Sequence, residues 1–247
     1  MKIRFKFRKQ GDLRFIGHLD VMRYYQKVFR RAELDMAFTG GYSPHIIMTF
    51  AAPLGLGLTS EGEYMDAEFQ SAPGKEELIA RMNAVSVPEL TVTDACLLPD
   101  DAKNAMASLA EADYTVRLRK ERPESKGFFD AFSAWLQSDE IRIEKKTKKS
   151  TKELDLKPLI RRFERSGNAI SMRVSQGSEN NLKPELLLAV FLRGTGTERF
   201  WLPVVPEGAE EIPETWIRSV FAISRDEMYA MDAGIARPMI EMGERNF

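Results

Sequence analysis

The order of two hydrophobic periods along the first hundred residues constrains the fold most. Ile3, Phe5 and Phe7 alternate with basic residues, which is the pattern of a strand with one buried face. From Asp20 to Ala32 apolar side chains recur at helical spacing, with basic side chains opposite them. Further patterns predict strands over 46–50, 63–69 and 89–97 and a helix over 75–84. The predicted order is therefore strand, helix, strand, strand, helix, strand.

The second half of the chain repeats this order with different residues. Strand alternation begins at Tyr114, and further elements are expected as a helix over 128–136, strands over 141–144 and 170–174, and an apolar helix over 184–192. We therefore predict an α+β fold of two ferredoxin-like βαββαβ halves with antiparallel sheets, at residues 1–98 and 112–193. Residues 194–247 are expected to form a C-terminal extension that packs on the second half.

Cysteine usage and hydropathy limit the class of protein. The chain has 247 residues, 43% of them hydrophobic, and a single cysteine, Cys96. One thiol excludes a disulfide framework and any iron–sulfur or zinc site built from several thiolates. No stretch approaches the roughly 18 consecutive apolar residues of a membrane span. We expect a cytoplasmic protein that contacts no membrane and binds no cofactor itself.

The net charge of −1 conceals a strong segregation of charge. Residues 1–31 hold ten bases against two acids, and 141–165 hold ten against four, whereas 61–113 hold twelve acids against three bases. Such runs can simply be solvated surfaces, but they also suit a phosphate backbone. If the halves pack with their basic surfaces adjoining, one continuous groove for nucleic acid is expected. Its predicted residues are Arg4, Lys6, Arg8, Arg23, Lys27, Arg30, Arg31, Lys145, Lys146, Lys148, Lys149 and Lys152.

A second group of polar residues surrounds the segment FTGGYSPHIIMTFAAPLGLGLTSEGEY. Asp20 is placed to cap the helix that follows FIGHL, and His18 lies at the same helix mouth, where an anion is favoured. With His45, Glu61 and Glu63 they could form an acid–base or mixed nitrogen and oxygen metal site. Without a compact spacing such as HExxH, structural histidines are favoured, and His18 and His45 are only weak metal candidates. We predict that these groups share one cleft.

A third candidate precedes the apolar helix expected from Pro184. The segment GSENNLKP supplies Ser178, Asn180, Asn181 and Lys183, residue types that cap a helix or bind an anion at its start. Capping alone would explain the asparagines. No P-loop, dinucleotide fingerprint or nucleophile elbow is present in the sequence.

Four motifs in order resemble a known family. The segments FIGHLDVMR, GGYSPH with TFAAPLGLGLTSEGEYMDAEF, KKTKKSTKELDLKPLI, and GSENNLKPELLL are similar to signatures of the bacterial radical-SAM-associated (radical-SAM-linked) proteins, a domain of unknown function. Gly17 and Gly41-Tyr42 replace the commoner serine and glycine-phenylalanine. The resemblance implies association with a radical SAM protein, to which this domain is fused or beside which it is encoded, often near genes for RNA processing. It supplies no catalytic residues.

Two classes of function follow. The first is a noncatalytic accessory or substrate-recognition module that works with a cobalamin-type radical SAM protein and binds RNA or a ribonucleoprotein. The partner would carry the iron–sulfur cluster, S-adenosylmethionine and, where present, cobalamin. The second is an enzyme with a cryptic acid–base or metal site around His18, Asp20, His45, Glu61 and Glu63. The segregated charge favours the first, and the shaped, polar segment 38–64 favours the second.

Overall fold

The computed structural model describes residues 1–120, 127–146, 151–178, 180–200, 202–205 and 211–247. The chain forms two compact units, one of residues 1–112 with 225–247 and one of residues 113–224. Two strands carry the chain from one unit to the other, β5 (Leu109–Leu118) and β10 (Phe221–Asp232). The fold is mixed α+β, and its strand pairing is mostly antiparallel, as predicted.

The first unit contains every element expected from the first half of the sequence. These elements are β1 (Lys2–Lys9), α1 (His18–Arg31), β2 (Met48–Phe50), β3 (Thr59–Glu68), α2 (Lys75–Ala84) and β4 (Val92–Leu98). The strand order is β4-β1-β3-β10, with β2 also pairing to β3. Strand β1 is antiparallel to both β3 and β4, and β2 is antiparallel to β3. Two short 3-10 turns, η1 (Gly11–Phe15) and η2 (Pro88–Leu90), follow β1 and precede β4.

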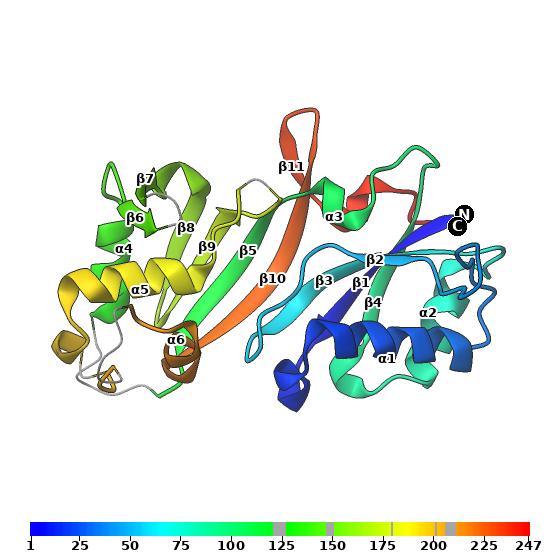
Figure 1. Ribbon diagram of the computed structural model, residues 1–247, viewed down its shortest axis with the longest axis horizontal. Coiled ribbons are helices and arrows are strands. Elements are labelled where there is room, and N and C mark those ends of the chain that lie inside the picture. Colours follow the sequence, from blue (N-terminus) through cyan, green and yellow to red (C-terminus); the bar gives the residue numbers. More distant parts are fainter. Residues whose placement is uncertain (121–126, 147–150, 179, 201, 206–210) are drawn as a thin grey trace. The chain divides into compact units, whose positions relative to one another are not determined.

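Helices α1 and α2 cover one face of this sheet (Figure 1). The alternation that defined β1 buries Phe5 and Phe7 completely against α1, and the Phe7 ring lies 4.8 Å from that of Tyr25. Burial of such a side chain contributes about 1.5–3 kcal/mol. The helical spacing in α1 places its apolar residues on the same side, facing β1, and leaves its basic residues outside.

Within the expected C-terminal extension, residues 194–224 belong to the second unit and residues 225–247 to the first. Strand β10 lies beside β3, and it is followed by β11 (Ile235–Pro238) and η6 (Met239–Met242). The sequence hid β10 because a charged residue, Arg225, occupies the buried position that follows Phe221 and Ile223 in the alternation. An arginine at that place interrupts the apolar period by which a half-buried strand is recognised.

The second unit has more strands than expected. Beside the end of β5 it contains α4 (Phe128–Leu136), β6 (Arg142–Lys146), β7 (Thr151–Asp155), β8 (Ile160–Ser166), β9 (Ala169–Ser175), α5 (Pro184–Thr195) and α6 (Glu214–Val220). The strand order is β5-β9-β8, while β6 and β7 form a separate antiparallel pair. Strand β8 escaped prediction because it is largely exposed and charged, as edge strands often are. A short helix, α3 (Ala105–Ser108), precedes β5.

Aromatic side chains fill the core of the second unit. The ring centroids of Phe128 and Phe132 of α4 lie 5.6 and 5.2 Å from the ring centroid of Phe191 of α5. The ring centroid of Phe221 lies 5.1 Å from that of Phe128. These separations are those of favourable edge and tilted ring contacts. Among the residues described in both units, no helix has the length and apolar character needed to cross a membrane.

A candidate nucleic-acid interface and a buried polar cluster

Helix α1 presents a row of cations on its exposed side. Arg23, Lys27, Arg30 and Arg31 are exposed, while the opposite side of the helix buries Val21, Tyr25, Val28 and Phe29. Steps of three or four residues keep these cations on one side of the helix. Arg23 pairs with Asp20 at 3.5 Å, whereas Lys27, Arg30 and Arg31 make no ion pair with any described residue. We call Arg23, Lys27, Arg30 and Arg31 the α1 basic row.

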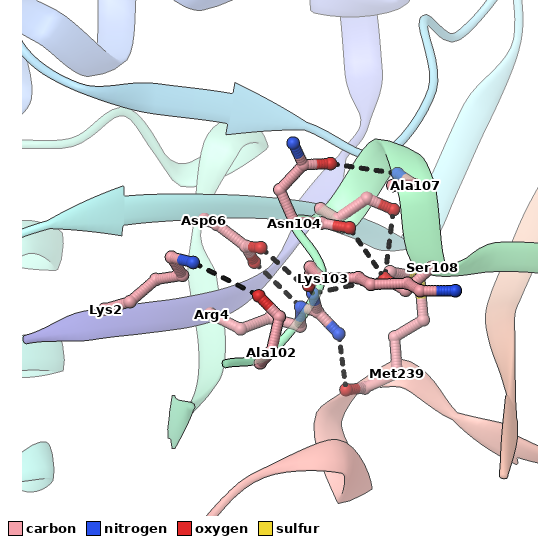
Figure 2. Close-up of polar contacts among 10 residues, drawn as sticks. Lys2, Arg4, Asp66, Ala102, Lys103, Asn104, Ala107, Ser108 and Met239 are labelled. Atoms are coloured by element: carbon pink, nitrogen blue, oxygen red, sulfur yellow. Dashed lines mark hydrogen bonds and ion pairs between the residues drawn. The ribbon is translucent and has the colours of Figure 1, made fainter. Parts of the chain in front are cut away.

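The other predicted basic row, on β1, is not an exposed surface. Arg4 is only 1% exposed, and its Nε and Nη2 donate to the carboxylate of Asp66 at 2.7 and 2.9 Å. Figure 2 shows the same guanidinium directed at the carbonyl oxygen of Met239 and at Ser108. The second face of the sheet is therefore covered at this point by α3 and η6, and Arg4 cannot reach a nucleic acid.

Lys6 and Arg8 are half-buried on the same side of β1. Lys6 pairs with Glu227 of β10 at 2.6 Å, and Glu227 also accepts a hydrogen bond from Tyr64. Arg8 donates to the carbonyl oxygen of Pro88 at 3.2 Å. The period-two pattern correctly separated the two faces of β1, but it could not show that acidic residues distant in sequence neutralise the charged face.

Three of the predicted lysines lie in strands, Lys145 and Lys146 in β6 and Lys152 in β7. Lys145 pairs with Lys152 and Lys146 with Thr151 in the backbone register of β6 and β7. Lys148 and Lys149 lie outside the described residues. The continuous groove that would join these lysines to α1 stays a prediction.

Buried charge gathers instead where the N-terminal end of α1 meets the sheet. Glu63 of β3 accepts hydrogen bonds from Nε and Nη2 of Arg225 at 2.8 and 2.5 Å. The same guanidinium donates to the carbonyl oxygen of Ala52 at 3.1 Å. Lys9 is also buried and donates to the carbonyl oxygen of Ile16 at 2.8 Å. Glu63, Lys9 and His18 line one small cavity, and we call them with Arg225 the buried polar cluster.

His18 is the first residue of α1 and is half-buried in this cluster. Its ring meets Phe50 edge-on, with ring centroids 5.2 Å apart. Burial lowers the pKa of His18 and Lys9 adds to that effect, while Glu63 opposes it. The imidazole is therefore neutral at pH 7. The cavity volume is about 10 Å³, which is room for about one water molecule and for no organic substrate.

The five residues predicted to share one cleft do not all meet. Only His18 and Glu63 line the same cavity. Asp20 is exposed, and it does not cap α1, because the N-cap is Gly17 without a side-chain bond. Glu61 is exposed and accepts a hydrogen bond from Gln10.

His45 lies at the other end of β3. The pairing of Met48 with Ala67 and the backbone bond between Ile47 and Glu68 carry the chain beyond that end of the strand. At about 3.3 Å per residue, His45 is roughly 20 Å from Glu61. His45 is exposed and contacts Thr39 at 3.1 Å. Across the described residues there is no group of three or more side chains placed to hold a metal ion.

Two glycines in residues 38–64 occupy positions where the backbone has a positive φ or lies very close to another strand. Gly57 has φ of +86°, and its N–H donates to the carbonyl oxygen of Arg14 at 2.8 Å, which ties residues 51–58 to η1. A Cβ on Gly62 would lie 2.6 Å from the carbonyl oxygen of Asp226. These glycines therefore allow close contacts among η1, β3 and β10.

The segment before α5 does not supply the expected side-chain cap, and anion binding there stays a prediction. Ser178, Asn180 and Asn181 are exposed, and the N-cap is Lys183, which makes no side-chain capping bond. Lys183 pairs with Glu214 at 2.9 Å. Glu185 in the first turn is buried beside Arg218. Glu185 therefore supplies a negative charge in the first turn of α5, where the helix dipole favours one.

Lys9 and Arg225 were missed as members of the buried polar cluster, although each left a signal in the sequence. Lys9 follows Phe7 in the alternation of β1, on its buried side, and Arg225 follows Ile223 in the same way. A cation at an apolar position of a strand indicates a buried, partnered charge.

The geometry defines a mixed α+β protein with a basic helix face and a sheet that contains buried ion pairs. The chain belongs to a family described as uncharacterized protein conserved in bacteria (DUF2344), whose sequence profile matches residues 2–184. The match covers the basic helix and the buried polar cluster except for Arg225. No curated protein matches the chain.

Proposed function

We propose that this chain is a noncatalytic accessory or substrate-recognition module that binds RNA through the α1 basic row. The observation that supports the proposal best is the exposure of Lys27, Arg30 and Arg31 without an ion-pair partner among the described residues. Charges that no carboxylate neutralises can contact phosphates and release counterions, which supplies most non-specific affinity for nucleic acid. We also propose that the first unit is ferredoxin-like, because its strands run in the order β4-β1-β3-β2 with both helices on one face.

The second part of the proposal is a radical SAM partner. It rests on the four motifs that resemble the radical-SAM-associated proteins, which extend from residue 15, at the end of η1, to residue 188 in α5. In such a pair the partner would supply the iron–sulfur cluster, S-adenosylmethionine and cobalamin chemistry, and this chain would present the RNA. Copurification of the tagged chain with a cobalamin-type radical SAM protein, before and after ribonuclease treatment, tests the association and shows whether RNA bridges the two.

RNA binding is tested by the triple variant Lys27→Gln, Arg30→Gln, Arg31→Gln in filter binding across a salt series. Each lost phosphate contact lowers the slope of log affinity against log salt by about 0.7 for a single strand, so a decrease of about 2 is expected. The matched control is Lys103→Gln, Arg237→Gln, Arg245→Gln, which removes the same charge from the same unit outside α1. Equal losses in both variants would show a general charge effect. No binding by the parent protein would remove the RNA proposal.

An enzyme remains the second candidate function, because His18 and Glu63 line one cavity and the histidine is neutral. A neutral imidazole beside a carboxylate can accept a proton. The cavity takes about one water, so a substrate would have to open it. Calorimetric titration with zinc, manganese and iron tests the metal form of this candidate, and absence of heat with all three would leave only acid–base chemistry.

A further inference from the structure

Three exposed apolar side chains lie at the N-terminal end of α1, where the basic row begins. Phe15 ends η1, Leu19 is in the first turn of α1, and Leu56 is in the segment 51–58, with exposures of 60%, 58% and 52%. The bond from the Gly57 N–H to the Arg14 carbonyl oxygen holds Leu56 beside the end of η1. Apolar groups of this size need an explanation when they lie together on a surface.

One face of the Phe15 ring already has a partner. The guanidinium carbon of Arg14 lies 4.5 Å from the ring centroid, a cation–π contact. With Arg14 there, and the ring still 60% exposed, the remaining surface can accept a second planar group. The next cation along α1 is Arg23, followed by Lys27 and the two arginines of the last turn.

We infer that the α1 surface binds single-stranded RNA, with an unpaired base stacked on Phe15 and the phosphates following the α1 basic row. Single-strand sites combine an aromatic side chain on which a base stacks with a row of cations that follows the backbone. From Arg23 to Arg31 the row extends over about 12 Å of α1, at about 1.5 Å per residue. This inference rests on the proposed RNA binding, since it names the form of RNA that the same surface takes.

A paired helix would not use Phe15 in this way, because its bases are stacked and unavailable. Sequence-tolerant recognition of duplex RNA depends instead on contacts to phosphates and 2′-hydroxyls. The two forms therefore make opposite demands on the aromatic ring and similar demands on the cations. This difference provides a test that separates the inference from the proposed function on which it rests.

The experiment compares Phe15→Leu and Phe15→Trp with the parent chain. The probe is a labelled, unstructured oligoribonucleotide of about 12 nucleotides, alone and annealed to its complement. Phe15→Leu keeps an apolar side chain but cannot stack, so affinity for the single strand is expected to fall roughly 5- to 150-fold with an unchanged salt slope. Phe15→Trp is expected to bind at least as well as the parent. Met106→Ala, which changes a residue 58% exposed on α3, is the control.

The outcomes separate the two claims. Preference of the parent for the duplex would overturn the single-strand inference, and so would equal binding by Phe15→Leu and the parent. In either case a lower salt slope in the triple glutamine variant of α1 would still support the proposed function. If Phe15→Leu bound RNA normally but lost a copurifying protein, the apolar surface of Phe15, Leu19 and Leu56 would be a protein-docking surface, and the inference would be wrong. Absence of all RNA binding would remove both claims.

Discussion

Glu63 of β3 and Arg225 of β10 form a two-point ion pair in which the side chains are only 5% and 1% exposed. The residues are 162 positions apart in sequence. A second buried pair, Arg4 with Asp66, lies between the neighbouring strands β1 and β3. Buried pairs of this kind add little net stability over apolar residues, but they strongly penalise any arrangement in which one partner is left alone. We therefore interpret the pairs as fixing which segments pack on this sheet.

Breaking the Glu63–Arg225 pair should destabilise the protein severely. Arg225→Met leaves the Glu63 carboxylate buried without its guanidinium, and we expect a loss of about 3–5 kcal/mol in the free energy of unfolding measured with urea. The double variant Glu63→Leu, Arg225→Met should lose less than Arg225→Met alone, because neither member of the pair is left buried without the other. The control is Arg237→Gln, whose pair with Asp232 is about half-exposed and should contribute at most about 1 kcal/mol. A double variant worse than Arg225→Met would contradict this account.

Gly62 should tolerate no side chain. In Gly62→Ala the new methyl group would lie 2.6 Å from the carbonyl oxygen of Asp226, so β10 would have to move away from β3. Overpacking of this kind costs about 1–3 kcal/mol. The matched control is Gly40→Ala, where no atom lies within 4 Å and φ is not positive. Thermal unfolding of the two variants should differ clearly, and equal melting temperatures would contradict the close approach of the strands.

The first unit was largely predictable from sequence, because its elements follow clear apolar periods. The pattern of Ile3, Phe5 and Phe7 located β1, and helical spacing located α1 to within two residues at its start. The sequence did not reveal which charged side chains are buried and which are exposed. Arg4 and Arg23 are both arginines opposite an apolar face, yet one is buried against Asp66 and the other is exposed. That difference depends on α3 and η6, whose packing leaves no local signal in β1.

The candidate site was predicted only in part for the same reason. His18 and Glu63 were named together, but their actual companions are Lys9 and Arg225. His45 does not join them, because strand register places it at the opposite end of β3. Register is a property of strand pairing, and residue types alone do not determine it.

The lowered pKa of His18 predicts a pH dependence of stability. Burial is the main cause of the lowered value, so the unfolded chain binds a proton on this residue more tightly than the folded chain. The stability that depends on neutral His18 is therefore fully present above the unfolded pKa of about 6.5. It is lost as the pH falls toward the lower pKa of His18 in the folded chain. Urea unfolding between pH 7.5 and 5 should show declining stability that is weaker in His18→Gln. An identical decline in both proteins would assign the effect to other groups.

Asp20 should affect stability and RNA binding in opposite directions. It lies in the first turn of α1, where a negative charge interacts favourably with the helix dipole, and it pairs with Arg23 at 3.5 Å. Asp20→Asn should therefore cost about 0.3–1 kcal/mol in unfolding free energy. The substitution should also strengthen RNA binding, because it frees Arg23 from its ion pair and removes a negative charge close to the α1 basic row. Unfolding and filter-binding measurements on the same preparation check both signs, and weakened binding would contradict the role of the row.

The lysine-rich segment 145–152 offers a final test of whether the second unit takes part in RNA binding. Lys145 and Lys152 are backbone partners in the register of β6 and β7, and Lys148 and Lys149 lie between them in sequence. Replacing Lys145, Lys146, Lys148 and Lys149 by alanine should weaken binding similarly for all RNA sequences and lower the salt slope by about 0.7 per lost phosphate contact. The same change in Lys103, Lys157, Arg237 and Arg245 is the control. Unchanged affinity and slope in a folded variant of the lysine-rich segment would limit the RNA surface to the first unit, because four cations at a binding site cannot be removed without reducing counterion release.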